Sequence, residues 1–189
     1  LADTATRYRQ IHEALADVPR LLTVLTGAET PESLEAQANY VFSPEQTARA
    51  RALVRLATVL QFTLPGVPCV YYGDEAGLDG FGDPFCRKCY PWGQEDGALM
   101  DWYRALIRVR RGADAYAGGT YRTVKAKRGL FAFERRTKDS RALTVVNMGG
   151  ETDYPLPAGA VPLLGYEAER AGDVLCLQRY GCAILSLDA

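Results

Sequence analysis

Histidine is almost missing from this sequence, and cysteine is too sparse to suggest a metal site. The only histidine is His12, and the five cysteines include one close pair, Cys86 and Cys89, in a CxxC arrangement. A structural zinc ion takes four Cys or His ligands, so a lone CxxC favours two ordinary thiols, with a zinc site as the alternative interpretation. The sequence has no compact cluster of oxygen ligands of the kind that binds calcium. We therefore predict no metal and no cofactor.

Excess charge of one sign and long apolar runs are also missing. The formal net charge is −1, which favours neither nucleic acid nor an anionic membrane surface as a partner. No apolar run approaches the roughly 20 residues of a membrane-spanning helix. An odd number of cysteines without dense spacing is typical of a reducing compartment, so we predict a cytoplasmic protein. Leu1 is not a start methionine, and we expect the true N-terminus, with any signal peptide, to lie upstream.

The most informative stretch runs from Leu64 to Leu78. Its middle, 67–72, is almost wholly apolar and does not alternate, which predicts a strand buried on both faces of a parallel sheet. Asp74 and Glu75 follow just beyond the carboxyl end of that strand. In barrels of parallel strands, this edge carries the chemistry. The alternative is an ordinary turn with two solvated acids.

Helical periodicity predicts amphipathic helices over three ranges: 1–15, 44–64 and 97–111. The second has the clearest start, because Ser43 precedes a proline at the first helical position and Gln46 completes a capping box. A single helical turn is predicted over 33–38, within a loop. Trp102 and Tyr103 lie in the body of the third helix, so we expect them in the core.

From Thr120 onward, short runs of period two predict β-strands. The five clearest cover 121–125, 130–135, 142–147, 174–177 and 182–187. Glycine-rich and charged turns separate them. We expect a small antiparallel β-sandwich of about seven strands, with a domain boundary at Ala117-Gly118-Gly119. The two predicted domains are thus residues 1–117 and 118–189.

Three motifs occur in order after the helix that ends at Pro65: Tyr71-Tyr-Gly-Asp-Glu75, Asp83-Pro-Phe-Cys-Arg87 and Tyr90-Pro-Trp92. Together they resemble the end of the catalytic barrel in the α-amylase family of glycoside hydrolases, family 13, in its neopullulanase, maltogenic amylase and cyclomaltodextrinase branch. The resemblance implies a fold of mixed class, α/β plus all-β. The last strands and helices of a (β/α)8 TIM barrel would be followed by the β-sandwich. It also implies that the chain is only the C-terminal part of such an enzyme.

Asp17 falls on a catalytic position of that family. The run Ala16-Asp17-Val-Pro-Arg20 resembles the segment that carries the third carboxylate, which stabilises the transition state. Ala16 stands where the family has a histidine, and the strand expected before it is absent. A deletion, a degenerate copy and a simple helix cap at Asp17 are the other interpretations.

The resemblance also implies sugar contacts. Asp83 and Arg87 match a pair that hydrogen-bonds sugar hydroxyls, and a paired carboxylate and guanidinium present a fixed fork of acceptors and donors. A purely structural ion pair is the alternative. Trp92 is predicted either to stack on a sugar or to pack against the barrel. Asp74 and Glu75 are predicted to support the loop.

Two functions follow from these features. The first is the C-terminal segment of a retaining α-glucan hydrolase or transglycosylase, acting on α-glucans, maltooligosaccharides or cyclodextrins. The family's nucleophile and acid/base come from barrel strands four and five, which this chain lacks, so we expect the segment alone to be inactive. The second is a non-catalytic binding or structural relative. Part of a barrel also exposes strand edges, which favours a homo-oligomer.

Overall fold

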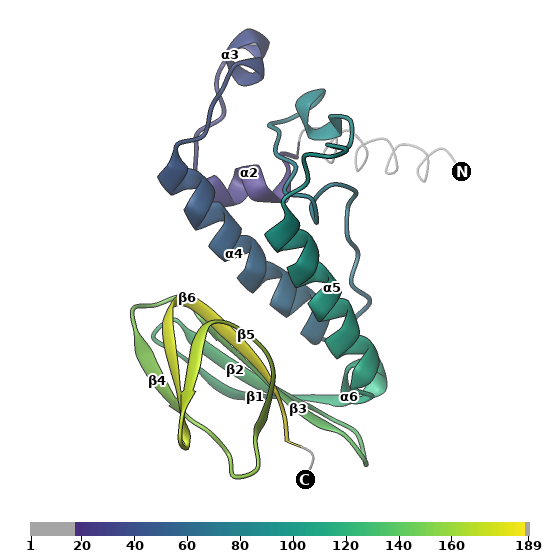
Figure 1. Ribbon diagram of the computed structural model, residues 1–189, viewed down its shortest axis with the longest axis vertical. Coiled ribbons are helices and arrows are strands. Elements are labelled where there is room, and N and C mark those ends of the chain that lie inside the picture. The colour runs from purple at the N-terminus through teal and green to yellow at the C-terminus, as the bar shows by residue number, and fades with distance from the viewer. Residues whose placement is uncertain (1–17, 188–189) are drawn as a thin grey trace, which may run out of the picture. The chain divides into compact units, whose positions relative to one another are not determined.

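The structure is a computed structural model that describes residues 18–187 (Figure 1). The predicted helix over 1–15, together with Asp17, lies outside the described residues. The chain divides into two compact units. The N-terminal unit contains the described residues up to Val54 together with Val70–Met100, and the sheet unit contains Arg55–Cys69 and the residues from Asp101 onward.

The N-terminal unit is built from short helices and long irregular segments. It contains α2 (Leu21–Thr26), α3 (Leu34–Ala38), the first half of α4 (Pro44–Thr63), the 3-10 helix η1 (Phe85–Arg87) and the start of α5 (Gly97–Gly112). The predicted capping box is confirmed. The Gln46 amide donates to Ser43 Oγ over 3.1 Å, and the Ser43 amide donates to Gln46 Oε1 over 2.9 Å. Ser33 likewise caps α3, by accepting from the Ala36 amide over 3.1 Å, so the predicted helical turn is confirmed.

The predicted parallel strand over 67–72 is wrong for this structure. These residues form irregular chain and the start of a turn, and Val67 is 93% exposed while Tyr71 is 49% exposed. The physical reason is the lack of neighbours. A strand buried on both faces needs hydrogen-bonded strands at its sides, and the described residues contain only antiparallel pairs, all of them after residue 119. The barrel itself stays a prediction.

The sheet unit is organised around one antiparallel sheet that curls on itself (Figure 1). Its six strands are β1 (Thr120–Lys127), β2 (Leu130–Arg136), β3 (Arg141–Asn147), β4 (Thr152–Pro155), β5 (Val161–Ala171) and β6 (Val174–Ser186). The order is β1-β2-β3-β6-β4, and β5 pairs with the other edge of β6. Because β6 pairs with β3 through its second half and with β4 through its first, it is the central strand.

Two details of the predicted β-domain need correction. The predicted sandwich of about seven strands is one six-stranded curled sheet, and the strands predicted over 174–177 and 182–187 are parts of the single strand β6. Residues 178–181 bulge out of the ladder, with Tyr180 at a φ of 63°. The sequence of these residues is typical of a turn, because a bulge places residues at positive φ, as turns do. For this reason one strand was predicted as two.

The strands of the sheet carry an apolar core. Its members are all at most 9% exposed and include Leu130, Leu143, Val145, Leu177 and Leu185. At such positions, burial contributes roughly 1.5–3 kcal/mol for each large side chain.

Helices pack beside the sheet within the same unit. Tyr116, on the short helix α6 (Ala115–Gly118), has its hydroxyl 3.4 Å from Thr144 Oγ1 of β3. Trp102 donates from its indole nitrogen to Thr58 Oγ1 over 3.1 Å, and the ring of Tyr103 meets that of Phe62 edge to face. Trp102 and Tyr103 are 7% and 4% exposed, so their predicted place in the core is confirmed. The predicted domain boundary near residue 117 stays a prediction.

All five cysteines are free thiols in different environments. Cys69 and Cys89 are exposed, whereas Cys86 and Cys182 are buried. Burial raises the pKa of Cys182 to about 12. Over residues 18–187 there is no group of three or more Cys, His, Asp or Glu side chains that could hold a metal ion. No helix in the described part of the chain is both long and apolar enough to span a membrane.

Candidate functional site

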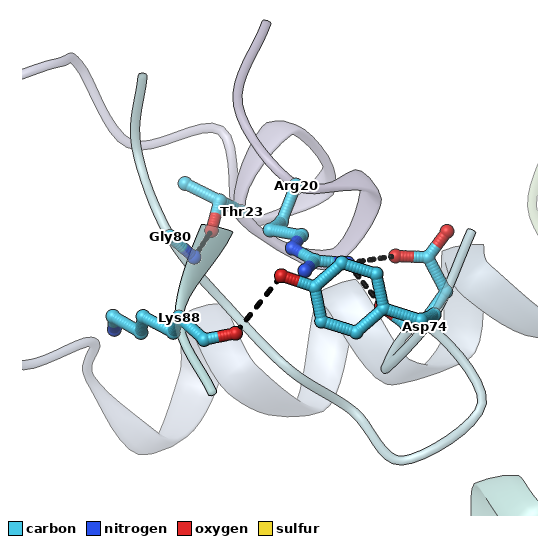
Figure 2. Close-up of polar contacts among 6 residues, drawn as sticks. Arg20, Thr23, Asp74, Gly80 and Lys88 are labelled. Carbon is cyan, nitrogen blue, oxygen red and sulfur yellow. Dashed lines mark hydrogen bonds and ion pairs between the residues drawn. The ribbon is translucent and has the colours of Figure 1, made fainter. Parts of the chain in front are cut away.

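The candidate site lies where the segment 18–26 meets the loop 71–80. The Arg20 amide donates to the Gly80 carbonyl over 2.8 Å, and the Gly80 amide donates to Thr23 Oγ1 over 2.7 Å (Figure 2). The Arg20 amide is available for this bond because Arg20 is the N-cap of α2, where backbone amides have no acceptor within the helix. Arg20 and Thr23 are both 2% exposed. The two segments are therefore joined by buried hydrogen bonds.

Arg20 makes the largest set of contacts at this junction. Its Nη1 donates to the Tyr72 carbonyl and lies 3.5 Å from Asp74 Oδ1. Its guanidinium carbon is 4.4 Å from the ring centroid of Tyr71 and 4.4 Å from that of Tyr72. Two aromatic faces thus offset part of the cost of burying the charge. Its Nε and Nη2 are also buried, and neither has a hydrogen-bond partner among the described residues.

Asp74 and Glu75, predicted to support the loop, lie at the edge of this junction. Burial raises the pKa of Asp74, and the nearby Arg20 opposes that rise only in part, while Glu75 adds to it. Glu75 Oε2 is buried without a hydrogen-bond partner in the described part of the chain. Gly73 permits the tight turn over 72–77, since its φ is 87° and a Cβ would lie 2.8 Å from the Leu78 side chain.

Asp83 and Arg87, predicted to contact sugar, form an ion pair across η1. The distance from Arg87 Nε to Asp83 Oδ1 is 3.3 Å, and the two side chains are 50% and 43% exposed. The four-residue spacing brings them together over the single turn of η1. The pair therefore presents a carboxylate and a guanidinium to solvent in one fixed arrangement.

The loop that Arg20 holds is connected to this ion pair. The Tyr72 hydroxyl donates to the Lys88 carbonyl over 3.0 Å, and Lys88 directly follows Arg87. Lys88 Nζ lies 2.7 Å from Asp79 Oδ1. Figure 2 shows Arg20, Asp74, Gly80 and Lys88 in one small region.

Trp92 is 81% exposed and lies against Tyr90, with 4.5 Å between ring centroids. An exposed indole next to a second ring is a surface on which an apolar sugar face can stack. The structure thus brings Asp74 close to Arg20, with Glu75 next to it in sequence, and brings Asp83 together with Arg87. Asp17 cannot be placed, because it lies outside the described residues.

Sequence reasoning did not identify Arg20, Thr23 or Tyr72 as parts of the site. Arg20 stands in the same short motif as Asp17, and this position in the motif could have marked Arg20 as a candidate site residue. Tyr72 was hidden because the apolar run 67–72 was interpreted as a strand, which would have placed its side chain inside a sheet.

No family model matches the chain, but curated proteins and solved structures are similar to it. A cyclomaltodextrinase of Thermoanaerobacter pseudethanolicus is 31% identical over 182 residues, covering 93% of this chain and 30% of the relative. Neopullulanase 2 of Thermoactinomyces vulgaris is 36% identical over 104 residues, covering 53% of this chain and 18% of the relative.

The fold also matches a solved structure. The cyclic α-maltosyl-(1→6)-maltose hydrolase of Arthrobacter globiformis superposes with a TM-score of 0.67 at 27% identity, over 92% of this chain and 33% of that enzyme. The chain spans about a third or less of the length of these relatives.

Proposed function

Because this chain is homologous to the C-terminal portion of enzymes in the α-amylase family of glycoside hydrolases, we propose that it supplies substrate contacts to an α-glucan hydrolase or transglycosylase. The substrate class is α-glucans, maltooligosaccharides or cyclodextrins. The observation that carries the proposal is the exposed Asp83–Arg87 pair. It stands in the motif that, in the related enzymes, is expected to bind sugar hydroxyls.

The physical chemistry of the pair fits ligand recognition better than stability. An exposed ion pair contributes only about 0–1 kcal/mol to folding, so this arrangement is not needed to hold η1. A guanidinium and a carboxylate in fixed geometry can donate to and accept from neighbouring hydroxyls at once. Trp92 would add a stacking surface for the apolar face of a sugar ring.

Catalysis requires groups beyond these. A retaining glycosidase uses a nucleophilic carboxylate and an acid/base carboxylate about 5 Å apart, and the family places both on barrel strands that precede the region of this chain. Asp17 is proposed as the third carboxylate, which stabilises the transition state. The chain alone is therefore proposed to bind sugar and to lack hydrolytic activity. A homo-oligomer and a cytoplasmic location stay predictions from the sequence.

Calorimetric titration with maltotriose and β-cyclodextrin tests the binding proposal. The Asp83→Ala, Arg87→Ala variant should weaken binding by about tenfold or more, because it removes charge-assisted hydrogen bonds. The matched control is Asp101→Ala, Arg104→Ala, which removes another exposed Asp–Arg pair with a 2.8 Å separation and should leave the affinity unchanged. A folded wild-type chain that gives no heat with either sugar would contradict a working sugar site.

A second function, a non-catalytic binding relative, is favoured by one observation: Ala16 stands at the position where the family has a histidine. A chimaera separates the two functions. This chain would replace the homologous C-terminal part of the Thermoanaerobacter pseudethanolicus cyclomaltodextrinase. The enzyme proposal expects cyclodextrin hydrolysis that increases with Ala16→His and disappears with Asp17→Asn. Sugar binding without hydrolysis, even with Ala16→His, would favour the binding relative.

A further inference from the structure

We propose that Arg20 and Tyr72 are positioning residues that set the geometry of the Asp83–Arg87 pair. This inference rests on the proposed function, since it assigns a role in sugar recognition to two residues that need not touch the sugar. The path runs from the buried guanidinium of Arg20, through Tyr72, to the backbone next to Arg87.

The first step is the hold that Arg20 has on Tyr72. The Nη1 group of Arg20 donates to the Tyr72 carbonyl, and the guanidinium plane lies over the Tyr72 ring with 4.4 Å to its centroid. Backbone and side chain of Tyr72 are thus fixed by the same group. The Arg20 amide adds a third point of attachment at Gly80, over 2.8 Å. The phenol of Tyr72 is therefore aimed by a buried residue, although it is itself 41% exposed.

The second step is the contact between that phenol and the end of η1. The Tyr72 hydroxyl donates to the Lys88 carbonyl over 3.0 Å, at the residue where the backbone leaves helical geometry for a ψ of 151°. The end of η1 is also held by its own turn, in which the Arg87 amide donates to the Pro84 carbonyl over 3.0 Å, and by the exposed Lys88–Asp79 pair. The Tyr72 hydroxyl adds a bond to the residue directly after Arg87, so a change at Tyr72 can alter the direction in which the Arg87 side chain leaves the backbone.

The chemistry of Arg20 argues for a positioning role over simple stabilisation. Its Nε and Nη2 groups are buried and have no hydrogen-bond partner among the described residues, and unpaired buried donors reduce stability. Apolar side chains of similar volume often hold a core as well as a buried ion pair does. A guanidinium, however, can donate to a carbonyl and a carboxylate from its N–H groups and contact aromatic rings at its faces, which an apolar side chain cannot do.

A double-mutant cycle on β-cyclodextrin affinity tests this path. Tyr72→Phe keeps the ring and removes only the hydroxyl, and we expect it to weaken binding about threefold to tenfold. In an Arg87→Gln background, Tyr72→Phe should have no further effect, because the group that it positions has gone. Effects that multiply would show that Tyr72 acts independently of Arg87 and would overturn the proposal. The matched control is Tyr121→Phe, since Tyr121 is 40% exposed and its hydroxyl also makes one hydrogen bond, to Thr123 over 2.8 Å.

A measurement without sugar separates this inference from the proposed function. NMR spectra of the Arg87 Nε–H group and the Asp83 carboxyl report on the ion pair itself. Arg20→Lys and Tyr72→Phe should shift both signals, and Tyr121→Phe should leave them in place. Shifted signals in a chain that binds no sugar would support the positioning path and contradict the sugar site. Unchanged signals in both variants would overturn the positioning path, whatever the sugar affinity.

Discussion

Different forces stabilise the curled sheet and the loop from Tyr71 to Trp92. In the sheet, six of the seven residues of β3 are buried, and a large apolar cluster joins the strands. The loop also buries a few apolar side chains, such as Leu78 and Phe81, but its links to neighbouring segments are made by a buried guanidinium, aromatic rings, a threonine hydroxyl and backbone carbonyls. Burial of apolar surface is non-directional, whereas hydrogen bonds fix particular atoms. The sheet is therefore stabilised chiefly by the apolar surface that it buries, whereas the conformation of the loop is fixed by a few individual hydrogen bonds.

The largest expected effect is a loss of unfolding free energy when the apolar core of the sheet is disrupted. Leu185 on β6 is fully buried in the apolar core, so Leu185→Ala should lower the free energy of unfolding by about 2–5 kcal/mol. Urea denaturation followed by circular dichroism measures the change. Leu163→Ala on β5 is the control, because Leu163 is 41% exposed and its truncation should cost roughly 0.5 kcal/mol or less. Equal effects of the two variants would contradict the assignment of the core.

A smaller effect is expected when one buried hydrogen bond of the loop is removed. Thr23→Val keeps the shape of the side chain but leaves the buried Gly80 amide without its 2.7 Å partner. The local opening free energy of the loop should fall by about 1–3 kcal/mol, measured by native-state hydrogen exchange at Gly80.

The amides of β3 and β6 serve as the internal reference for Thr23→Val. Their exchange should be unchanged if loop and sheet open separately. An equal loss of protection in the sheet would show that the two regions unfold as one, which would remove the distinction between them.

The smallest effect is a pH dependence that belongs to the loop alone. The pKa of Asp74 is raised above its ordinary value of 3.8, chiefly by burial. The folded state then binds more protons than the unfolded state between the ordinary and the raised value, so stability falls as pH rises through that window. Asp74→Asn removes this titration. At about pH 7, we expect it to stabilise the loop by less than about 1 kcal/mol relative to the native residue.

Lowering the pH below the folded-state pKa of Asp74 should abolish the advantage of Asp74→Asn. Hydrogen exchange or urea denaturation at about pH 7 and about pH 3, which is below the ordinary pKa, measures the difference. Asp101→Asn is the control, since the Asp101 side chain is 78% exposed and should show no such dependence. An advantage of Asp74→Asn that grows on acidification would contradict the role of burial.

The two long described helices and most strands were predictable from the sequence because their signals are local, whereas the short helices α2 and α6 and the turn η1 were not predicted. The capping box at Ser43 and the periodicity of residues 97–111 need no distant partner, and both elements form as predicted. The strand over 67–72 failed because an unalternating apolar run becomes a strand only beside other strands. Strands β4 and β5 were not predicted. Strand β4 is short and ends at a proline, and buried and exposed residues alternate only partly along β5.

The candidate site was predictable only in part. Asp83 and Arg87 stand in a recognisable motif, and the structure brings them within 3.3 Å of each other. The contact between Arg20 and Tyr72 joins residues that are 52 positions apart. No local pattern can announce such a contact, because the choice of partner depends on how the loop folds back onto α2.

The contrast between exposed and buried thiols has a practical consequence for labelling. A pKa of about 12 for Cys182 leaves roughly one thiol in ten thousand ionised at about pH 8, and only the thiolate reacts with alkylating dyes. Cys69 and Cys89, both exposed, bracket the loop that contains Tyr72 and Arg87. Once the partly exposed Cys176 is replaced by serine, fluorophores at these two natural positions would report the distance between the two ends of that loop as sugar is added, while the Cys182 thiol stays unmodified.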